Sequence, residues 1–288
     1  MISDNKIWMY WNDGLENAPK SVQLCINSWK VQNKNYEVVV LEDNTISEWI
    51  DIPKFQDTVM TIQAFSNILR IFLLSKYGGI WADATLWCTK PVDGWVDNYS
   101  DDFFVFSNPT DSRMIASWFV KSSKDNIILK EWKDRVIDYI ENTKVVINNF
   151  WFHGLFEKIY NENIDVKNQW DSVLKYDVNR NNRVLENPLY FSKITDDDLD
   201  DLDDDFKFGV LNKTSPMYKL GWTINWLDTK KVKFLMSRYM NFENLRFIHI
   251  PKTGGTSIGD AAKENNLLWG KFDKELKSGK ISSRVSEM

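Results

Sequence analysis

Cysteine and histidine are scarce in this chain of 288 residues, which has two of each. The two cysteines, Cys25 and Cys88, are too few for a disulfide framework or a cysteine-rich zinc site. We therefore expect both thiols to be reduced and to serve packing rather than chemistry.

Long apolar runs are absent as well. No segment approaches the roughly 18–20 apolar residues of a membrane span. The first residues, MISDNKIW, lack the charged and apolar regions of a signal peptide. Hydrophobic residues still make up 43% of the chain, which is enough to build a sizeable core. These features predict a cytoplasmic α/β protein with at most peripheral contact with the inner face of the membrane.

Positively charged residues are fewer than negatively charged ones. The chain has 36 Lys and Arg residues against 41 Asp and Glu, a net charge of −5. Because clustered Lys and Arg bind phosphate backbones, this balance argues against nucleic acid as a partner. Aromatic residues are plentiful at 14%, with 14 tryptophans. We expect most of them in the core, and the others are candidates for stacking on sugars or bases.

The N-terminal part predicts a parallel β-sheet. Residues 6–10 have the pattern of a strand, residues 18–32 that of an amphipathic helix, and residues 37–43 that of a continuous apolar, fully buried strand. Strand, helix and strand in this order predict a Rossmann-like βαβ unit. Glu42 and Asp43 end the second strand, where they either touch a nucleotide or belong to a solvated loop.

The most informative segment is FSNILRIFLLSKYGGIWADAT, residues 65–85. It predicts a helix that ends at Gly78 and Gly79, followed by a short buried strand, 80–82, that delivers Asp83 at its carboxyl end. Ligands of open α/β sheets bind at such strand ends, so the carboxylate is placed for sugar hydroxyls, ribose or a metal. Helical spacing predicts an outward-facing polar stripe on the helix that consists of Gln63, Ser66, Asn67 and Arg70. The alternative is a solvated helix face followed by a loop acid.

This pattern resembles the DXD glycosyltransferases of the GT-A fold, in particular the capsular polysaccharide synthesis family, over roughly residues 5–240. The positions that agree with the family pattern are Ser66, Arg70, Gly78, Gly79 and Asp83. Two positions depart from it, because Asn67 and Thr85 stand where the wider group has carboxylates. The resemblance implies transfer of a sugar from a nucleotide-sugar donor to a saccharide or lipid-linked saccharide acceptor in capsule or exopolysaccharide synthesis.

The resemblance also implies roles for individual residues. Asp83 and Arg70 would be catalytic, and Trp11, at the end of the first strand, would stack on the base. Ser66, Asn67 and Thr85 would help to bind the donor. Asp83 and Thr85 would hold a divalent cation, Mn²⁺ or Mg²⁺. Since one carboxylate and one hydroxyl make a poor site for a hard cation, we expect only a weak metal requirement.

The remainder of this region supplies further candidates. A strand is predicted at 103–109, and amphipathic helices are predicted around 125–141 and 148–161. His153 in the second helix either packs in the core or assists the reaction. Residues 214–226 are expected to return to the site, with Lys219 facing the diphosphate, whereas the acidic run 196–205 is expected to be a surface linker.

The C-terminal part, residues 241–288, carries a separate signal. Residues 245–250 predict a strand, the sequence PKTGGTS a glycine-bearing turn, and the residues from 258 onward a helix whose free N–H groups point at the turn. The candidate anion-binding residues are Lys252, Gly254, Gly255, Thr256 and Ser257. The segment closely resembles the 5′-phosphosulfate loop of polysaccharide sulfotransferases that use the donor PAPS.

Too few residues follow this loop, namely 258–288, to complete a sulfotransferase domain. We therefore predict a GT-A glycosyltransferase domain at 1–240, followed by an incomplete β-loop-α segment at 241–288. Two alternatives stay open: a PAPS-dependent polysaccharide sulfotransferase, and a sugar-binding protein without catalysis.

Overall fold

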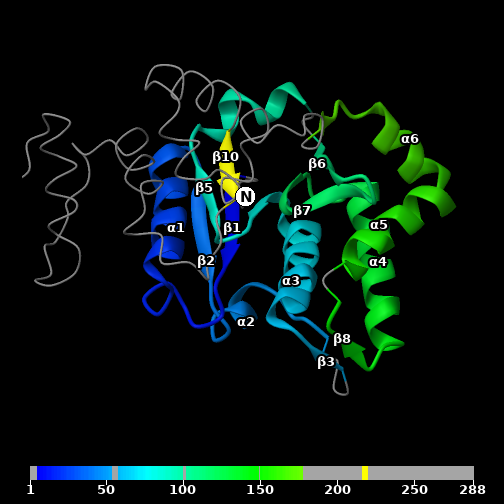
Figure 1. The fold of residues 1–288 in the computed structure, drawn as a ribbon, viewed down its shortest axis with the longest axis horizontal. Helices are drawn as coiled ribbons and strands as arrows, with labels where there is room; N and C mark the ends of the chain where they lie inside the picture. The colour runs from blue at the N-terminus through cyan, green and yellow to red at the C-terminus, as the bar shows by residue number, and fades with distance from the viewer. Residues whose placement is uncertain (1–4, 54–57, 100–101, 149, 178–215, 220–288) are drawn as a thin grey trace, which may run out of the picture. The chain divides into compact units, whose positions relative to one another are not determined.

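The computed structural model describes residues 5–53, 58–99, 102–148, 150–177 and 216–219, all within one compact unit (Figure 1). The acidic run 196–205 lies outside these residues. So does the phosphosulfate-like loop with Lys252, Gly254, Gly255, Thr256 and Ser257. The predictions made for both segments therefore stay predictions.

A mixed six-stranded sheet forms the centre of this unit, in the order β2-β1-β4-β7-β6-β9. Strand β1 is parallel to both β2 and β4, β7 is antiparallel to β4 and β6, and β9 is parallel to β6. The strands are β1 (Lys6–Tyr10), β2 (Glu37–Leu41), β4 (Gly79–Ala82), β6 (Phe103–Thr110), β7 (Arg113–Ser122) and β9 (Tyr176–Asp177).

Helices and two small strand pairs surround the sheet. The helices are α1 (Lys20–Gln32), α2 (Ile46–Trp49), α3 (Ile62–Tyr77), α4 (Ile127–Glu141), α5 (Trp151–Glu162) and α6 (Ile164–Ser172), with 3₁₀ turns at Val92–Gly94 and Val96–Asn98. The parallel pair joins β3 (Val59–Met60) to β8 (Val145–Val146), and the antiparallel pair joins β5 (Leu86–Cys88) to β10 (Met217–Lys219). None of the described helices is long and apolar enough to cross a membrane.

The predicted βαβ unit is confirmed as β1-α1-β2. Helix α1 begins at Lys20, directly after Pro19, which has no N–H to leave unpaired at a helix start. Its apolar face is buried as the spacing predicted, and it consists of Val22, Cys25, Ile26 and Trp29. Cys25 and Cys88 are both free and buried, in agreement with a packing role.

Two features of the sheet differ from the prediction. Strand β2 was expected to be fully buried, but residues 38–40 are only half-buried because β2 forms an edge of the sheet. Strand β7 was not predicted, although it is the longest strand described and pairs with both β4 and β6. Outside the sheet, helix α6 was not predicted either.

The alternation of side chains along the strands creates a core on each face of the sheet. Trp8 and Trp81 belong to one core, which α3, α4, α5 and α6 cover. Ile7 and Ile80 belong to the other, which α1 and β5 cover. Figure 1 shows α1 on one side of β1 and β2, and α3, α4 and α5 gathered on the other. The ends of the strands, rather than the faces of the sheet, are therefore left for a site.

Candidate active site

The three parallel strands β1, β2 and β4 end on the same side of the sheet, and each is followed by a candidate site residue. Since Trp8 pairs with Trp81 and Tyr10 pairs with Leu41, the carboxyl ends of β4, β1 and β2 lie next to one another. Trp11 follows β1, and its N–H donates to the carbonyl of Leu41 at 3.0 Å. The side chain of Trp11 packs half-buried against the core on the α1 side. Its stacking on a base stays a prediction.

Helix α3 is joined to β4 by the predicted glycine pair. Gly78 and Gly79 have φ angles of 67° and 92°, which other residues rarely adopt. A Cβ on Gly78 would lie 2.8 Å from the backbone nitrogen of Lys124. No other residue therefore fits at Gly78, and the short connection turns the chain directly from the end of α3 into the start of β4. Asp83 follows β4 directly, as predicted, and its N–H donates to Trp118 O at 2.9 Å.

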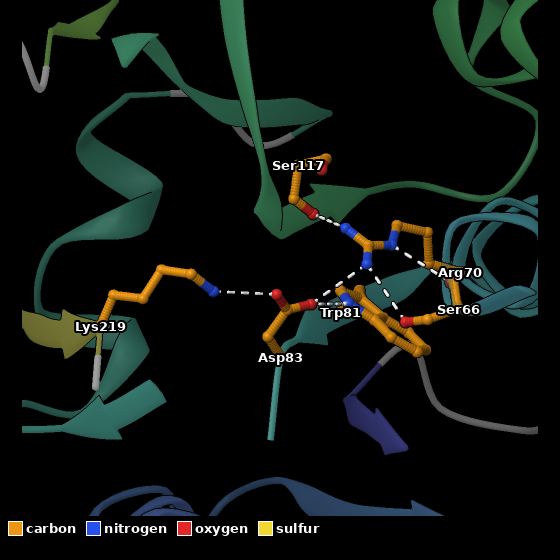
Figure 2. Close-up of polar contacts among 6 residues, drawn as sticks. All are labelled: Ser66, Arg70, Trp81, Asp83, Ser117 and Lys219. Atoms are coloured by element: carbon orange, nitrogen blue, oxygen red, sulfur yellow. Dashed lines mark hydrogen bonds and ion pairs between the residues drawn. The ribbon is translucent and has the colours of Figure 1, made fainter. Parts of the chain in front are cut away.

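Arg70 is buried beside Asp83 at this strand end rather than exposed on the surface (Figure 2). The predicted outward-facing stripe is wrong at two positions, since Arg70 is 4% exposed and Asn67 is 6% exposed. The reason is that this side of the helix faces the sheet, where Ser117 O and Asp83 Oδ1 accept hydrogen bonds from the Arg70 guanidinium. Arg70 donates to Ser117 O through Nη1, to Ser66 O through Nε at 3.3 Å, and to Ser66 Oγ through Nη2 at 3.2 Å. A buried charge needs such partners.

Asp83 completes the surroundings of Arg70. Its Oδ1 accepts from Arg70 Nη2 at 3.1 Å and from Trp81 Nε1 at 2.9 Å. Burial alone would raise the pKa of Asp83, but Lys219 and Arg70 outweigh burial and hold that pKa below its ordinary value. The side chain is still 25% exposed. Asp83 is therefore a fixed, ionised carboxylate that a ligand can reach.

Lys219 binds the other oxygen of the same carboxylate. Strand β10 pairs with β5, with Lys219 opposite Leu86, and Lys219 Nζ lies 3.1 Å from Asp83 Oδ2. The expected return of this C-terminal segment to the site is thus confirmed for Met217–Lys219. The ammonium group also lies 5.9 Å from the centre of the Trp118 ring. Its predicted contact with a diphosphate is untested.

The predicted metal ligands, Asp83 and Thr85, are close in the chain, because Thr85 belongs to the turn between β4 and β5. Yet the donor set fits a divalent cation poorly. Both oxygens of Asp83 already face N–H donors, two of them from cations. Within the described ranges no three His, Cys, Asp or Glu side chains gather as a metal site would need. A cation at Asp83 would have to displace Lys219.

The sequence left open whether His153 packs in the core or assists the reaction. In the structure it is close enough to Arg70 and Asp83 for their charges to act on it. It lies in the first turn of α5, and its Nδ1 is buried with no hydrogen-bond partner among the residues that the structure describes. Burial, together with Arg113 and Arg70, lowers the pKa of His153 to about 4, although Asp83 opposes the shift. His153 is therefore neutral near pH 7 and cannot act there as a proton donor in its charged form.

Replacing His153 with glutamine should make folding stability less sensitive to acid. The unfolded chain binds a proton at His153 with a pKa near 6.5, whereas the folded chain does so only near 4. Between these values the unfolded state binds more protons, so the native protein loses stability as the pH falls. Urea unfolding of both proteins at pH 7, 6, 5 and 4 should show the wild type losing more stability than the variant. Parallel curves would contradict the lowered pKa.

Comparison with known proteins gives two curated relatives. The chain is 24% identical over 154 residues to O-glycosyltransferase braB of Annulohypoxylon truncatum, and 24% identical over 150 residues to glycosyltransferase afumC of Aspergillus fumigatus. These matches cover 46% and 44% of this chain, and 37% and 38% of the relatives. The chain thus spans well under half the length of the curated relatives that it matches.

A solved structure, the PaToxG glycosyltransferase, is similar over 58% of this chain and 74% of its own, with 18% identity and a TM-score of 0.39. The sequence model of a family described as capsular polysaccharide synthesis protein matches residues 1–239. That match includes α3, the glycine pair, Asp83 and Lys219. The chain belongs to the capsular polysaccharide synthesis protein family.

Proposed function

We propose that this chain is a glycosyltransferase that moves a sugar from a nucleotide-sugar donor to a saccharide or lipid-linked saccharide acceptor in capsular or exopolysaccharide synthesis. The observation that carries the proposal is the ionised, partly exposed Asp83 at the carboxyl end of β4, held by buried Arg70 and flanked by Lys219. Family membership and the names of both curated relatives support it.

The proposal includes a GT-A type of fold for residues 1–240. The parallel β1-α1-β2 unit and the site at the shared carboxyl edge of β1, β2 and β4 support this assignment. In this arrangement Trp11 stacks on the base. Asp83 accepts hydrogen bonds from hydroxyl groups of the ribose or the donor sugar. The half-buried Ser66 accepts from Arg70, and the half-buried Thr85 follows Asp83 by two residues in the turn before β5.

Arg70 has a different role from the one that the sequence indicated. Its donors are committed to Ser66, Ser117 and Asp83, and the residue is 4% exposed. It therefore positions Asp83 and does not touch the donor. Asn67, buried on the same side of α3, is likewise placed to support the site from within.

Stabilisation of the leaving group is the main chemical task. During transfer the bond between the anomeric carbon and the diphosphate oxygen breaks, and its electron pair remains on the diphosphate. The acceptor oxygen forms the new bond to the anomeric carbon and releases its proton to water. Charge builds on the departing diphosphate, so a positioned cation lowers the barrier. Lys219 is the partly exposed cation at this site, with 28% of its side chain accessible.

A donor panel tests the proposal. The full-length chain is incubated with UDP-, GDP-, ADP- and dTDP-linked sugars, and nucleotide release is measured with and without Mn²⁺. We expect at least one donor to be turned over faster by the wild type than by Asp83→Asn. Saturable binding of a saccharide with no turnover of any donor would favour the alternative of a sugar-binding protein.

The same panel should contain PAPS, because the sequence around Lys252 resembles a phosphosulfate loop. Sulfate transfer from PAPS that is lost in Lys252→Ala, with no turnover of nucleotide sugars, would replace the proposed function by the sulfotransferase alternative.

A further inference from the structure

The carboxylate of Asp83 is surrounded by positive charge. Arg70 and Lys219 approach it from two sides, each with a nitrogen 3.1 Å from one of its oxygens. One negative charge thus faces two positive charges, so the cluster carries a net charge of about +1 at neutral pH. Such a cluster attracts an anion and repels a divalent cation.

No nearby acid in the described part of the chain reverses this balance. Glu42 and Asp43 follow β2, which β1 separates from β4 in the sheet. The Oδ1 of Asp43 already accepts from the hydroxyl of Tyr10 at 2.5 Å. Neither acid joins Asp83 in a group that could hold a metal ion. At position 85, where a second carboxylate would add negative charge, the residue is threonine.

Lys219 is able to serve a second partner. An ammonium group has three N–H donors, and one hydrogen bond, to Asp83 Oδ2, is found for Lys219 in the described region. The side chain is 28% exposed, unlike that of Arg70 at 5%. Its position is fixed by the pairing of β10 with β5 and by its ion pair. An exposed, oriented ammonium with spare donors suits the oxygens of a diphosphate.

We propose that Lys219 takes the place of a divalent cation at Asp83: its ammonium binds the diphosphate of the donor, and donor binding requires no metal. The inference rests on the proposed function and specifies how the donor is held. Asp83 orients Lys219 and stays ionised because of it. The positive charge that a metal ion would supply next to Asp83 and the diphosphate is supplied by the side chain of Lys219.

The first test measures Mn²⁺ alone, by the electron paramagnetic resonance signal of the free ion. Wild type, Lys219→Met and the control Lys158→Met, an exposed lysine on α5, are compared. Methionine keeps an unbranched apolar stem and removes the charge. We expect the wild type and the control to bind Mn²⁺ no tighter than about 1 mM, and Lys219→Met to bind it at least ~10-fold tighter, since a repelling charge next to Asp83 is gone. Wild-type affinity in the low micromolar range, unimproved by Lys219→Met, would overturn the proposal.

The second test measures binding of UDP, GDP, ADP and dTDP, each by calorimetry in excess EDTA and in Mn²⁺. We expect the wild type to bind one of them with similar affinity in both buffers. Lys219→Met should lose at least ~10-fold in EDTA and recover part of the loss in Mn²⁺, whereas Lys219→Arg should keep most of the affinity. Thermal unfolding of each variant verifies that it is folded.

Different results would contradict the role of Lys219 and the proposed function. Binding that appears only with Mn²⁺ would sink the role of Lys219 and leave the proposed transferase intact. Absence of binding to all four nucleotides in both buffers, together with no turnover in the donor panel, would sink the proposed function itself.

Discussion

Asp83→Asn should reduce sugar transfer by at least about 100-fold, the scale of losing one positioned electrostatic group in an active site. The amide keeps the shape of the side chain but removes the charge that orients Lys219 and accepts donor hydroxyls. It also leaves Arg70 buried without a counter-ion, which we expect to cost about 2–3 kcal/mol of stability, because one partner of a buried pair is lost. Steady-state kinetics and urea unfolding measure the two effects.

Asp97→Asn is the matched control. Asp97 also pairs with a lysine, Lys121, but its side chain is 48% exposed. The same chemical change there should alter stability by less than about 1 kcal/mol and leave transfer unchanged, because water screens the exposed carboxylate of Asp97. If Asp83→Asn kept most of the wild-type activity, the site would have to lie elsewhere.

Arg70→Met should have the second largest effect, and it should act through Asp83. Removing the guanidinium leaves Ser117 O and one side of Asp83 without their donor, so we expect a loss of about 3–5 kcal/mol in stability. Transfer should fall by at least about 100-fold in kcat, with a smaller change in donor KM, because in the proposed site Arg70 acts through Asp83 and not on the donor. Arg135→Met, at an exposed pair with Glu162, is the control and should change little.

A pH profile distinguishes positioning of Asp83 from mere support of the fold. Arg70 is one of the two cations that hold the pKa of Asp83 below its ordinary value. Without Arg70 that pKa rises, so Asp83 is protonated at a higher pH. The acidic limb of the activity profile of Arg70→Met should therefore move to higher pH than in the wild type. An unmoved limb would mean that Arg70 only supports the fold.

Local patterns were sufficient to predict much of this site. The strand at Lys6–Tyr10, the helix that ends at Gly78 and the delivery of Asp83 by β4 all follow from short-range periodicity and glycine chemistry. The family resemblance was confirmed by the match over residues 1–239. The family pattern also pointed to Ser66, Arg70 and Asp83, which the structure brings together.

Long-range contacts could not be predicted in the same way. Helical spacing showed that Arg70 and Asn67 share a stripe, but not which way the stripe faces. That direction depends on β7, whose Ser117 lies 47 residues further along the chain, and β7 itself was not predicted. Lys219 is 136 residues from Asp83, and only its basic, aromatic neighbourhood hinted at its return. The edge position of β2 likewise depends on strand order, which no local pattern contains.

The glycine joint between α3 and β4 sets a limit on transplanting this site. Arg70 and Asp83 stand on opposite sides of the joint, so the length of their ion pair depends on the angle at which the helix meets the strand. That angle exists because Gly78 can lie against the backbone of Lys124. Copying Arg70 and Asp83 alone onto another protein would leave them out of reach of each other. To reproduce the ion pair, residues 62–83 would have to be transferred together with the backbone that contacts them at Ser117 and Lys124.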